Sequence, residues 1–173
     1  MTTALLVVDI QRALTDYLDP ARRVGFLDTV AALVKRARQA NVPVVYVRHN
    51  DAELRVGTKE WEITEEIGPR PGEPIVDKQY RDAFRETHLA DVLRGLAADH
   101  VVVCGMQTEF CIDATIREAE RRGYRVTLVE DAHATYPVDG ATEEQIRAQI
   151  HRVARGSVAA IVPAAEVFAP AVR

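Results

Sequence analysis

Six short apolar runs occur along the chain, and they alternate with longer stretches whose apolar residues recur at helical spacing. Nearly every position within a run is apolar, which is typical of strands that are covered on both faces and are therefore usually parallel. We predict a three-layer α/β/α domain with a six-stranded, mainly parallel sheet. The predicted strands are Ala4–Val8, Val42–Val47, Pro74–Val76, His100–Cys104, Arg125–Val129 and Ser157–Val162.

The intervening stretches predict helices, and one long segment fits neither pattern. The predicted helices are Phe26–Ala40, His88–Leu96, Glu109–Arg122 and Thr142–Arg155. Thr142 is followed three residues later by Gln145, which is the signature of a capping box. The segment 50–72 is polar and carries the single Trp of the chain. A loop of this length in a compact domain is often a lid or a binding loop.

Length and composition narrow the class of protein. The 173 residues predict one domain, 1–173, and the formal net charge of −4 without a Lys/Arg run argues against nucleic acid or an anionic membrane as a partner. No apolar run reaches the roughly 20 residues that cross a bilayer. The N-terminal stretch lacks the basic region of a secretory signal, and two cysteines seven positions apart make no disulfide framework. We therefore expect a cytoplasmic protein.

Three residues of catalytic types follow predicted strands. Asp9 follows the first run, Lys78 the third and Cys111 the fourth. In open α/β sheets, ligands bind beyond the carboxyl ends of the strands, so these side chains should meet at one edge. Each has a structural alternative: Asp9 as a turn or helix cap, Lys78 as a solvated lysine, and Cys111 as a packing residue. Together they could supply a nucleophile, a base and an orienting charge.

The two cysteines lie in different settings. Cys104 ends an apolar strand, where a free cysteine behaves as a small, inert hydrophobic residue. Cys111 falls in the first turn of a predicted helix, where unpaired N–H groups and the helix dipole lower the pKa of a thiol. A nearby lysine would lower this pKa further.

Four stretches together resemble the isochorismatase-like cysteine hydrolases, a family that includes nicotinamidases and N-carbamoylsarcosine amidases. They are "LLVVDIQ", "DKQYRDAF", "GMQTEFCIDATIREAERRGY" and "VTLVEDAHAT", and they span nearly the whole chain. The resemblance implies a catalytic triad of Asp9, Lys78 and Cys111. It also implies a cis peptide between Met106 and Gln107, an oxyanion hole made by the Gln107 and Cys111 amides, and a homodimer or homotetramer.

On this basis we predict a hydrolase that cleaves the C–N bond of a small amide, ureido or lactam compound through a thioester on Cys111. One alternative is hydrolysis of a vinyl ether, as in isochorismatases, which uses the Asp as an acid and does not need the Cys. Another is a catalytically idle binding or scaffold protein on the same fold. An intact set of Asp, Lys and Cys favours the amide reaction.

Further residues are candidates for the substrate pocket or for structural roles. The pocket candidates are Gln11, Tyr17, Trp61, Phe84 and Phe110, although both Phe residues could simply belong to the core. In "EDAHAT" we expect His133 to be a loop residue and Asp131 a structural hydrogen-bond acceptor. Arg81 and Asp82 lie where family members often have a small residue, which predicts a more charged pocket edge.

No metal or other cofactor is predicted. Nicotinamidases carry an Asp-x-His motif and a further His after the second strand, whereas the corresponding stretch here, "YVRHNDAEL", has His49 alone and no Asp-x-His. Three N/O ligands are the usual minimum for a catalytic zinc-type site. The apolar C-terminal segment 162–172 could serve an interface between copies of the chain.

Overall fold

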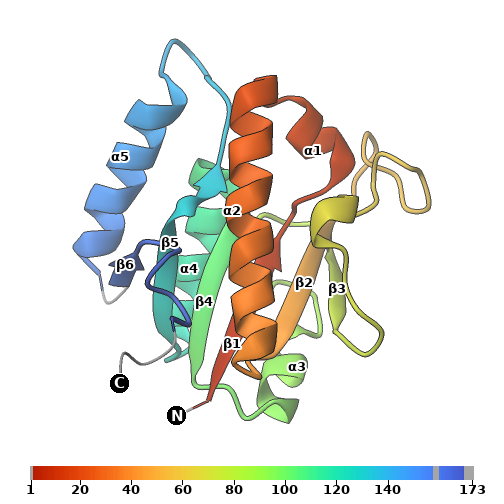
Figure 1. Ribbon diagram of the computed structural model, residues 1–173, viewed down its shortest axis with the longest axis vertical. Helices are drawn as coiled ribbons and strands as arrows, with labels where there is room; N and C mark the ends of the chain where they lie inside the picture. The colour runs from red at the N-terminus through yellow and green to blue at the C-terminus, as the bar shows by residue number, and fades with distance from the viewer. Residues whose placement is uncertain (1, 158–159, 170–173) are drawn as a thin grey trace.

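The computed structural model describes residues 2–157 and 160–169, and it confirms the predicted α/β/α fold (Figure 1). Six strands form one sheet in the order β3-β2-β1-β4-β5-β6, and every neighbouring pair is parallel. The strands are β1 Thr3–Val8, β2 Val44–His49, β3 Ile75–Lys78, β4 His100–Met106, β5 Arg125–Ala134 and β6 Ala160–Val162. Residues 158–159 of the predicted last strand lie outside the described residues.

Helices cover both faces of the sheet (Figure 1). On one face, Leu5 and Val7 of β1 pack into a cluster with the long helix α2 (Pro20–Gln39). On the other face, Leu6 packs with α3 (Leu89–Gly95), α4 (Asp113–Arg121) and α5 (Glu143–Arg155). Thr142 caps α5 through the predicted capping box. Among the described helices, none is both long and apolar enough to cross a membrane.

Three short elements lie outside this regular pattern: α1 (Arg12–Asp16), the 3₁₀ turn η1 (Glu65–Ile67) and the π-helical turn η2 (Thr108–Ile112). The helix predicted from Glu109 is therefore wrong in its first turn, because that turn is π-helical and α4 begins only at Asp113. Cys111 thus lies in a wider turn than an α-helix would provide.

Several strands end later than predicted, and this changes what lies at the edge of the sheet. β2 continues to His49 and β3 to Lys78, so these two residues are paired in register. β5 continues to Ala134, which places His133 in a strand rather than in the predicted loop. The polar residues Glu130 and Asp131 concealed this continuation in the sequence.

The sheet has its topological switch point between β1 and β4. The chain builds β2 and β3 on one side of β1 and then crosses to place β4 on the other side. In open α/β sheets a crevice for ligands forms at such a point, beyond the carboxyl ends of the strands. Asp9 follows β1 and Gln107 follows β4 at this position.

Gly105 allows β1 and β4 to approach closely beside the switch point. Its φ is +132°, and a Cβ atom added there would lie 1.9 Å from the Val8 carbonyl oxygen. The β4–β5 register shifts between Val103 and Gly105. Only glycine fits this position without moving the strand that leads to Asp9.

We expect Gly105→Ala to lower the free energy of unfolding by more than about 2 kcal/mol, because the new methyl group meets backbone that cannot move aside. Gly95→Ala is the matched control, since a Cβ atom at Gly95 meets nothing within 4 Å and its φ is not in the left-handed region. Guanidinium unfolding followed by circular dichroism measures both variants. Equal stabilities of the two would contradict the close approach.

Candidate active site

Three residues from separate parts of the chain meet at the carboxyl edge of the sheet. The Lys78 Nζ atom lies 2.7 Å from Asp9 Oδ2 and 3.3 Å from Cys111 Sγ. Asp9 and Lys78 are buried, whereas Cys111 is partly exposed. Cys111 is thus the member of the group that is partly open to solvent, while the ion pair beside it is shielded from water.

Local backbone geometry aims these side chains. Asp9 adopts a left-handed conformation with φ +52°, directly after β1, and its N–H donates to the Val47 carbonyl of β2. Lys78 is the last residue of β3. Cys111 lies in η2, where the Gln107 carbonyl accepts the N–H groups of Phe110 and Ile112. The Met106–Gln107 peptide just before this turn is cis, as the family resemblance implies.

Lys78 is held in its charged form. Burial acts to lower the pKa of Lys78, but the Asp9 carboxylate and the Cys111 sulfur outweigh burial and raise the pKa above its usual value. The Nζ atom also donates to the Tyr80 carbonyl at 3.0 Å. Lys78 is therefore a fixed cation between the carboxylate and the sulfur.

The two thiols differ in access but not in protonation. Burial, followed by the Asp9 carboxylate, raises the pKa of Cys111 to about 12, and Lys78 only partly opposes this. The expected low pKa is therefore not found, because burial and a neighbouring anion outweigh the helix terminus and the lysine. Cys104 is fully buried, and burial raises the pKa of its thiol as well. The buried, structural setting expected for Cys104 is confirmed.

The five predicted pocket residues occupy different environments. Gln11 is buried and bonds to the Trp61 carbonyl, and Trp61 lies in the long loop with the Arg48 guanidinium 3.7 Å from its ring centroid. Phe110 is half-buried next to Cys111. Phe84 lies in the core cluster with α3 and α4 and stacks on Tyr124.

The fifth candidate, Tyr17, is 73% exposed and packs against Tyr136, whose ring centroid is 5.6 Å away.

The two charged residues in the segment after Lys78, Arg81 and Asp82, have different roles. Asp82 caps the Phe84 N–H, whereas the Arg81 guanidinium lies 4.2 Å from the Phe110 ring centroid. Arg81 therefore lies beside Phe110, the residue before Cys111, and Asp82 stabilises the turn.

His49 contacts Lys78, which the sequence alone did not indicate. Its Nδ1 atom lies 3.2 Å from Lys78 Nζ, and its Nε2 atom lies 3.2 Å from Asp51 Oδ2. Both ring nitrogens are thus engaged with protein groups, and the described residues contain no group of three or more His, Cys, Asp or Glu that could hold a metal ion. The donor set does not fit a nicotinamidase-type metal.

A second histidine, His133 near the end of β5, also contacts other side chains through both ring nitrogens. His133 is buried between Thr108 Oγ1 and His151 Nε2, each 2.8 Å away. Burial, reinforced by neighbouring Arg147, lowers the pKa of His133 well below its usual value, so the ring is neutral. Asp131 accepts the Ala164 N–H at 2.7 Å, which confirms its predicted role as a structural acceptor.

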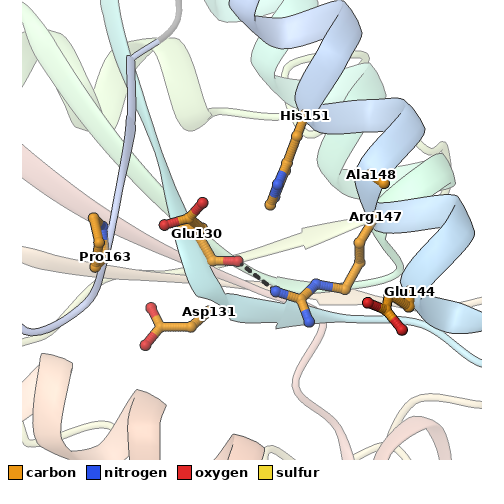
Figure 2. A pocket seen from close by; sticks show the side chains of 7 residues that line it. All are labelled: Glu130, Asp131, Glu144, Arg147, Ala148, His151 and Pro163. Atoms are coloured by element: carbon orange, nitrogen blue, oxygen red, sulfur yellow. Dashed lines mark hydrogen bonds between the residues drawn. The ribbon is translucent and has the colours of Figure 1, made fainter.

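A cavity of about 450 Å³ opens between α5 and the β5–β6 edge of the sheet (Figure 2). Five of its seven lining residues have charged or titratable side chains; the lining residues are Glu130, Asp131, Glu144, Arg147, Ala148, His151 and Pro163. Arg147 donates to the Glu130 carbonyl across it. None of the three triad residues lines this cavity, so its volume does not describe the space beside Cys111.

The family model for the isochorismatase domain matches residues 3–161. The chain belongs to the isochorismatase family. A streptothricin hydrolase from Streptomyces noursei is 38% identical over 146 residues, which cover 81% of this chain and 52% of that protein. Nicotinamidase 3 from Arabidopsis thaliana is 31% identical, covering 77% of this chain and 73% of the relative.

The chain spans only about half the length of the streptothricin hydrolases that it matches. Among solved structures, an isochorismatase from Pseudomonas putida superposes with a TM-score of 0.87 at 26% identity, covering 95% of this chain and 89% of that one. The family model and this structural neighbour therefore agree on the isochorismatase-like fold.

We expect Lys78→Met to lower the free energy of unfolding by about 3–5 kcal/mol near pH 7, because it leaves the Asp9 carboxylate buried without a counter-charge. Asp9→Asn in the same chain removes that charge, so the double variant should recover most of the lost free energy. Urea unfolding of both variants at pH 7 measures this.

Arg94→Met is the matched control for the lysine variant. It breaks an ion pair with Asp91 whose side chains are 75% and 71% exposed, and it should cost less than about 1 kcal/mol. A double variant that is no more stable than Lys78→Met would show that the buried carboxylate is not the cause of the deficit.

Proposed function

We propose that the protein is a cysteine-dependent hydrolase that cleaves the C–N bond of a small amide, ureido or lactam compound through a thioester. The observation that carries this proposal is the position of Lys78 Nζ, which contacts both the Asp9 carboxylate and the Cys111 sulfur. The names of the relatives support it, since they include a streptothricin hydrolase and a nicotinamidase.

Asp9 is the general base in this mechanism. Apart from the ion pair with Lys78, neither Asp9 oxygen has a hydrogen-bond donor among the described residues, so the carboxylate is free to accept a proton. The Cys111 thiol is protonated at rest because its pKa is raised. Transfer of its proton to Asp9 generates the thiolate as the sulfur attacks the substrate carbonyl.

The backbone then stabilises the tetrahedral intermediate. In the proposal, the Gln107 and Cys111 amides donate to the developing oxyanion, and one such donor is worth about 3–4 kcal/mol. Protonated Asp9 gives its proton to the leaving nitrogen, and the C–N bond breaks to leave a thioester on Cys111. Asp9 next takes a proton from a water molecule, whose oxygen attacks the thioester. The C–S bond breaks to release the acid, and Asp9 returns the proton to the Cys111 sulfur.

The protein is proposed to act on a small molecule without nucleic acid or membrane as a partner, and to form a homodimer or homotetramer in the cytoplasm. These features rest on composition and on the family resemblance. Gel filtration with light scattering measures the oligomeric state directly, and a monomer at micromolar concentration would contradict that part.

We expect Cys111→Ala to abolish hydrolysis on a panel of amides, ureido acids and lactams, since no nucleophile is left to form the thioester. Cys104→Ala is the matched control because Cys104 is buried away from the triad, and it should keep wild-type kcat/KM if the protein stays folded. Mass spectrometry of a reaction stopped within one turnover should show an acyl adduct on Cys111.

Hydrolysis of isochorismate with equal rates in wild type and Cys111→Ala would instead favour the vinyl-ether reaction, which needs the Asp but not the Cys. Absence of any hydrolysis, combined with saturable binding of a compound from the panel, would favour a binding protein. Both outcomes would contradict the thioester mechanism.

Extensive dialysis against a chelator should leave amide hydrolysis unchanged, because the proposed reaction uses only side chains and backbone amides of this chain. The measurement compares kcat/KM before and after dialysis and after addition of zinc, manganese or iron(II). A loss that a metal restores would contradict the prediction.

A further inference from the structure

The Lys78 ammonium group has more acceptors than hydrogens. A lysine ammonium carries three N–H donors. Four acceptor atoms surround Nζ: Asp9 Oδ2 at 2.7 Å, the Tyr80 carbonyl at 3.0 Å, His49 Nδ1 at 3.2 Å and Cys111 Sγ at 3.3 Å. The hydrogen-bond geometry directs the three hydrogens at Tyr80, His49 and Cys111, whereas the shortest contact, to Asp9, is an ion pair outside that geometry. A hydrogen that turns toward the nearby carboxylate is therefore taken from one of the other three acceptors. With one hydrogen on each of the two oxygens, a single hydrogen is left for His49 and Cys111.

The His49 ring is fixed in the tautomer that accepts this hydrogen. Its Nε2 atom faces the Asp51 carboxylate, which can only accept, so the ring proton lies on Nε2 and the Nδ1 lone pair faces Lys78. Asp51 is itself held, because its Oδ1 accepts the N–H groups of Leu54 and Glu53. These bonds, led by that from Leu54, keep the pKa of Asp51 below its usual value.

The His49 backbone is clamped as firmly as its ring. The side-chain amide of buried Gln11 accepts the His49 N–H at 2.8 Å and donates to the His49 carbonyl at 2.9 Å. His49 also pairs in register with Lys78 across β2 and β3. Backbone and ring contacts therefore all direct Nδ1 at the Lys78 ammonium.

We propose that His49 is a positioning residue that shares the third Lys78 N–H with the Cys111 sulfur, and thereby limits how strongly Lys78 stabilises the thiolate. The proposal rests on the proposed function, in which Cys111 is the nucleophile. A thiol sulfur is a weak acceptor, so this hydrogen lies toward His49 at rest.

When the Cys111 proton passes to Asp9, the thiolate becomes the stronger acceptor and the ammonium rotates its third hydrogen toward sulfur. The covalent N–H bond stays intact, and only the hydrogen-bond acceptor changes. Among the described residues, the His49 ring contacts two charged groups, Lys78 on β3 and Asp51 in the following loop, and Lys78 in turn contacts Asp9 and Cys111.

The test is the rate of Cys111 alkylation by iodoacetamide at pH 7, with the labelled site located by mass spectrometry. His49→Phe keeps a ring but offers no acceptor, so the third N–H goes to sulfur. Labelling should then become roughly 3- to 10-fold faster, which corresponds to a fraction of the strength of a charge-assisted hydrogen bond. His49→Gln offers an amide oxygen in place of Nδ1 and should stay within about twofold of wild type.

His100→Phe is the matched control. His100 is the first residue of β4, so it lies at the amino ends of the strands, opposite the carboxyl ends that carry the site. Its ring nitrogens likewise bond to two side chains, those of Thr3 and Thr127. Its labelling rate at Cys111 should equal that of wild type. If His49→Phe does not fold, Asp51→Asn takes its place, because it frees the ring tautomer and should also speed labelling.

Slower or unchanged labelling in the folded His49→Phe variant, or in Asp51→Asn, overturns the proposal. Lys78→Met separates this result from a failure of the proposed function. Slow labelling in Lys78→Met with no effect of the His49 variants would refute only the role of His49. Labelling that is unchanged in Lys78→Met would show that Cys111 is not activated, and both proposals would fall together.

Discussion

The buried ion pair between Lys78 and Asp9 is the constraint on which the site depends. Moving two charges out of water costs several kcal/mol for each ion, and only close contact with a counter-charge and further hydrogen bonds offset this cost. Both side chains are almost completely inaccessible, and their charged atoms are 2.7 Å apart. The strand ends that carry them must therefore be held in fixed relative positions.

The surrounding sheet provides that fixed frame. β2 lies between β1 and β3, and it ties both ends together: the Asp9 N–H bonds to Val47, and the Asn50 N–H bonds to the Lys78 carbonyl. On the other side, Gly105 lets β4 approach β1 closely enough to bring η2 and Cys111 to the same ammonium group. Core packing on both faces of β1 thus determines the geometry of a charged centre that lies outside the core.

The sequence predicted the fold and the three meeting residues, because apolar runs mark buried parallel strands and the residues after such strands share one edge. It did not predict the contact of His49 with Lys78, since that contact depends on where β2 and β3 end, and pairing in the sheet decides those ends. The π-helical turn at Cys111 was missed as well, because a 3.6-residue pattern does not distinguish it from an α-helix.

A buried ion pair adds little to stability compared with apolar residues of the same size, so its retention needs a chemical reason. The proposed proton transfer supplies one. When the proton moves from Cys111 to Asp9, negative charge moves from the carboxylate to the sulfur, and Lys78 contacts both. The net charge of the buried site does not change, and its cation is already in place. In the proposed role of His49, its Nδ1 atom adds an acceptor beside Lys78 and thereby influences the proton transfer.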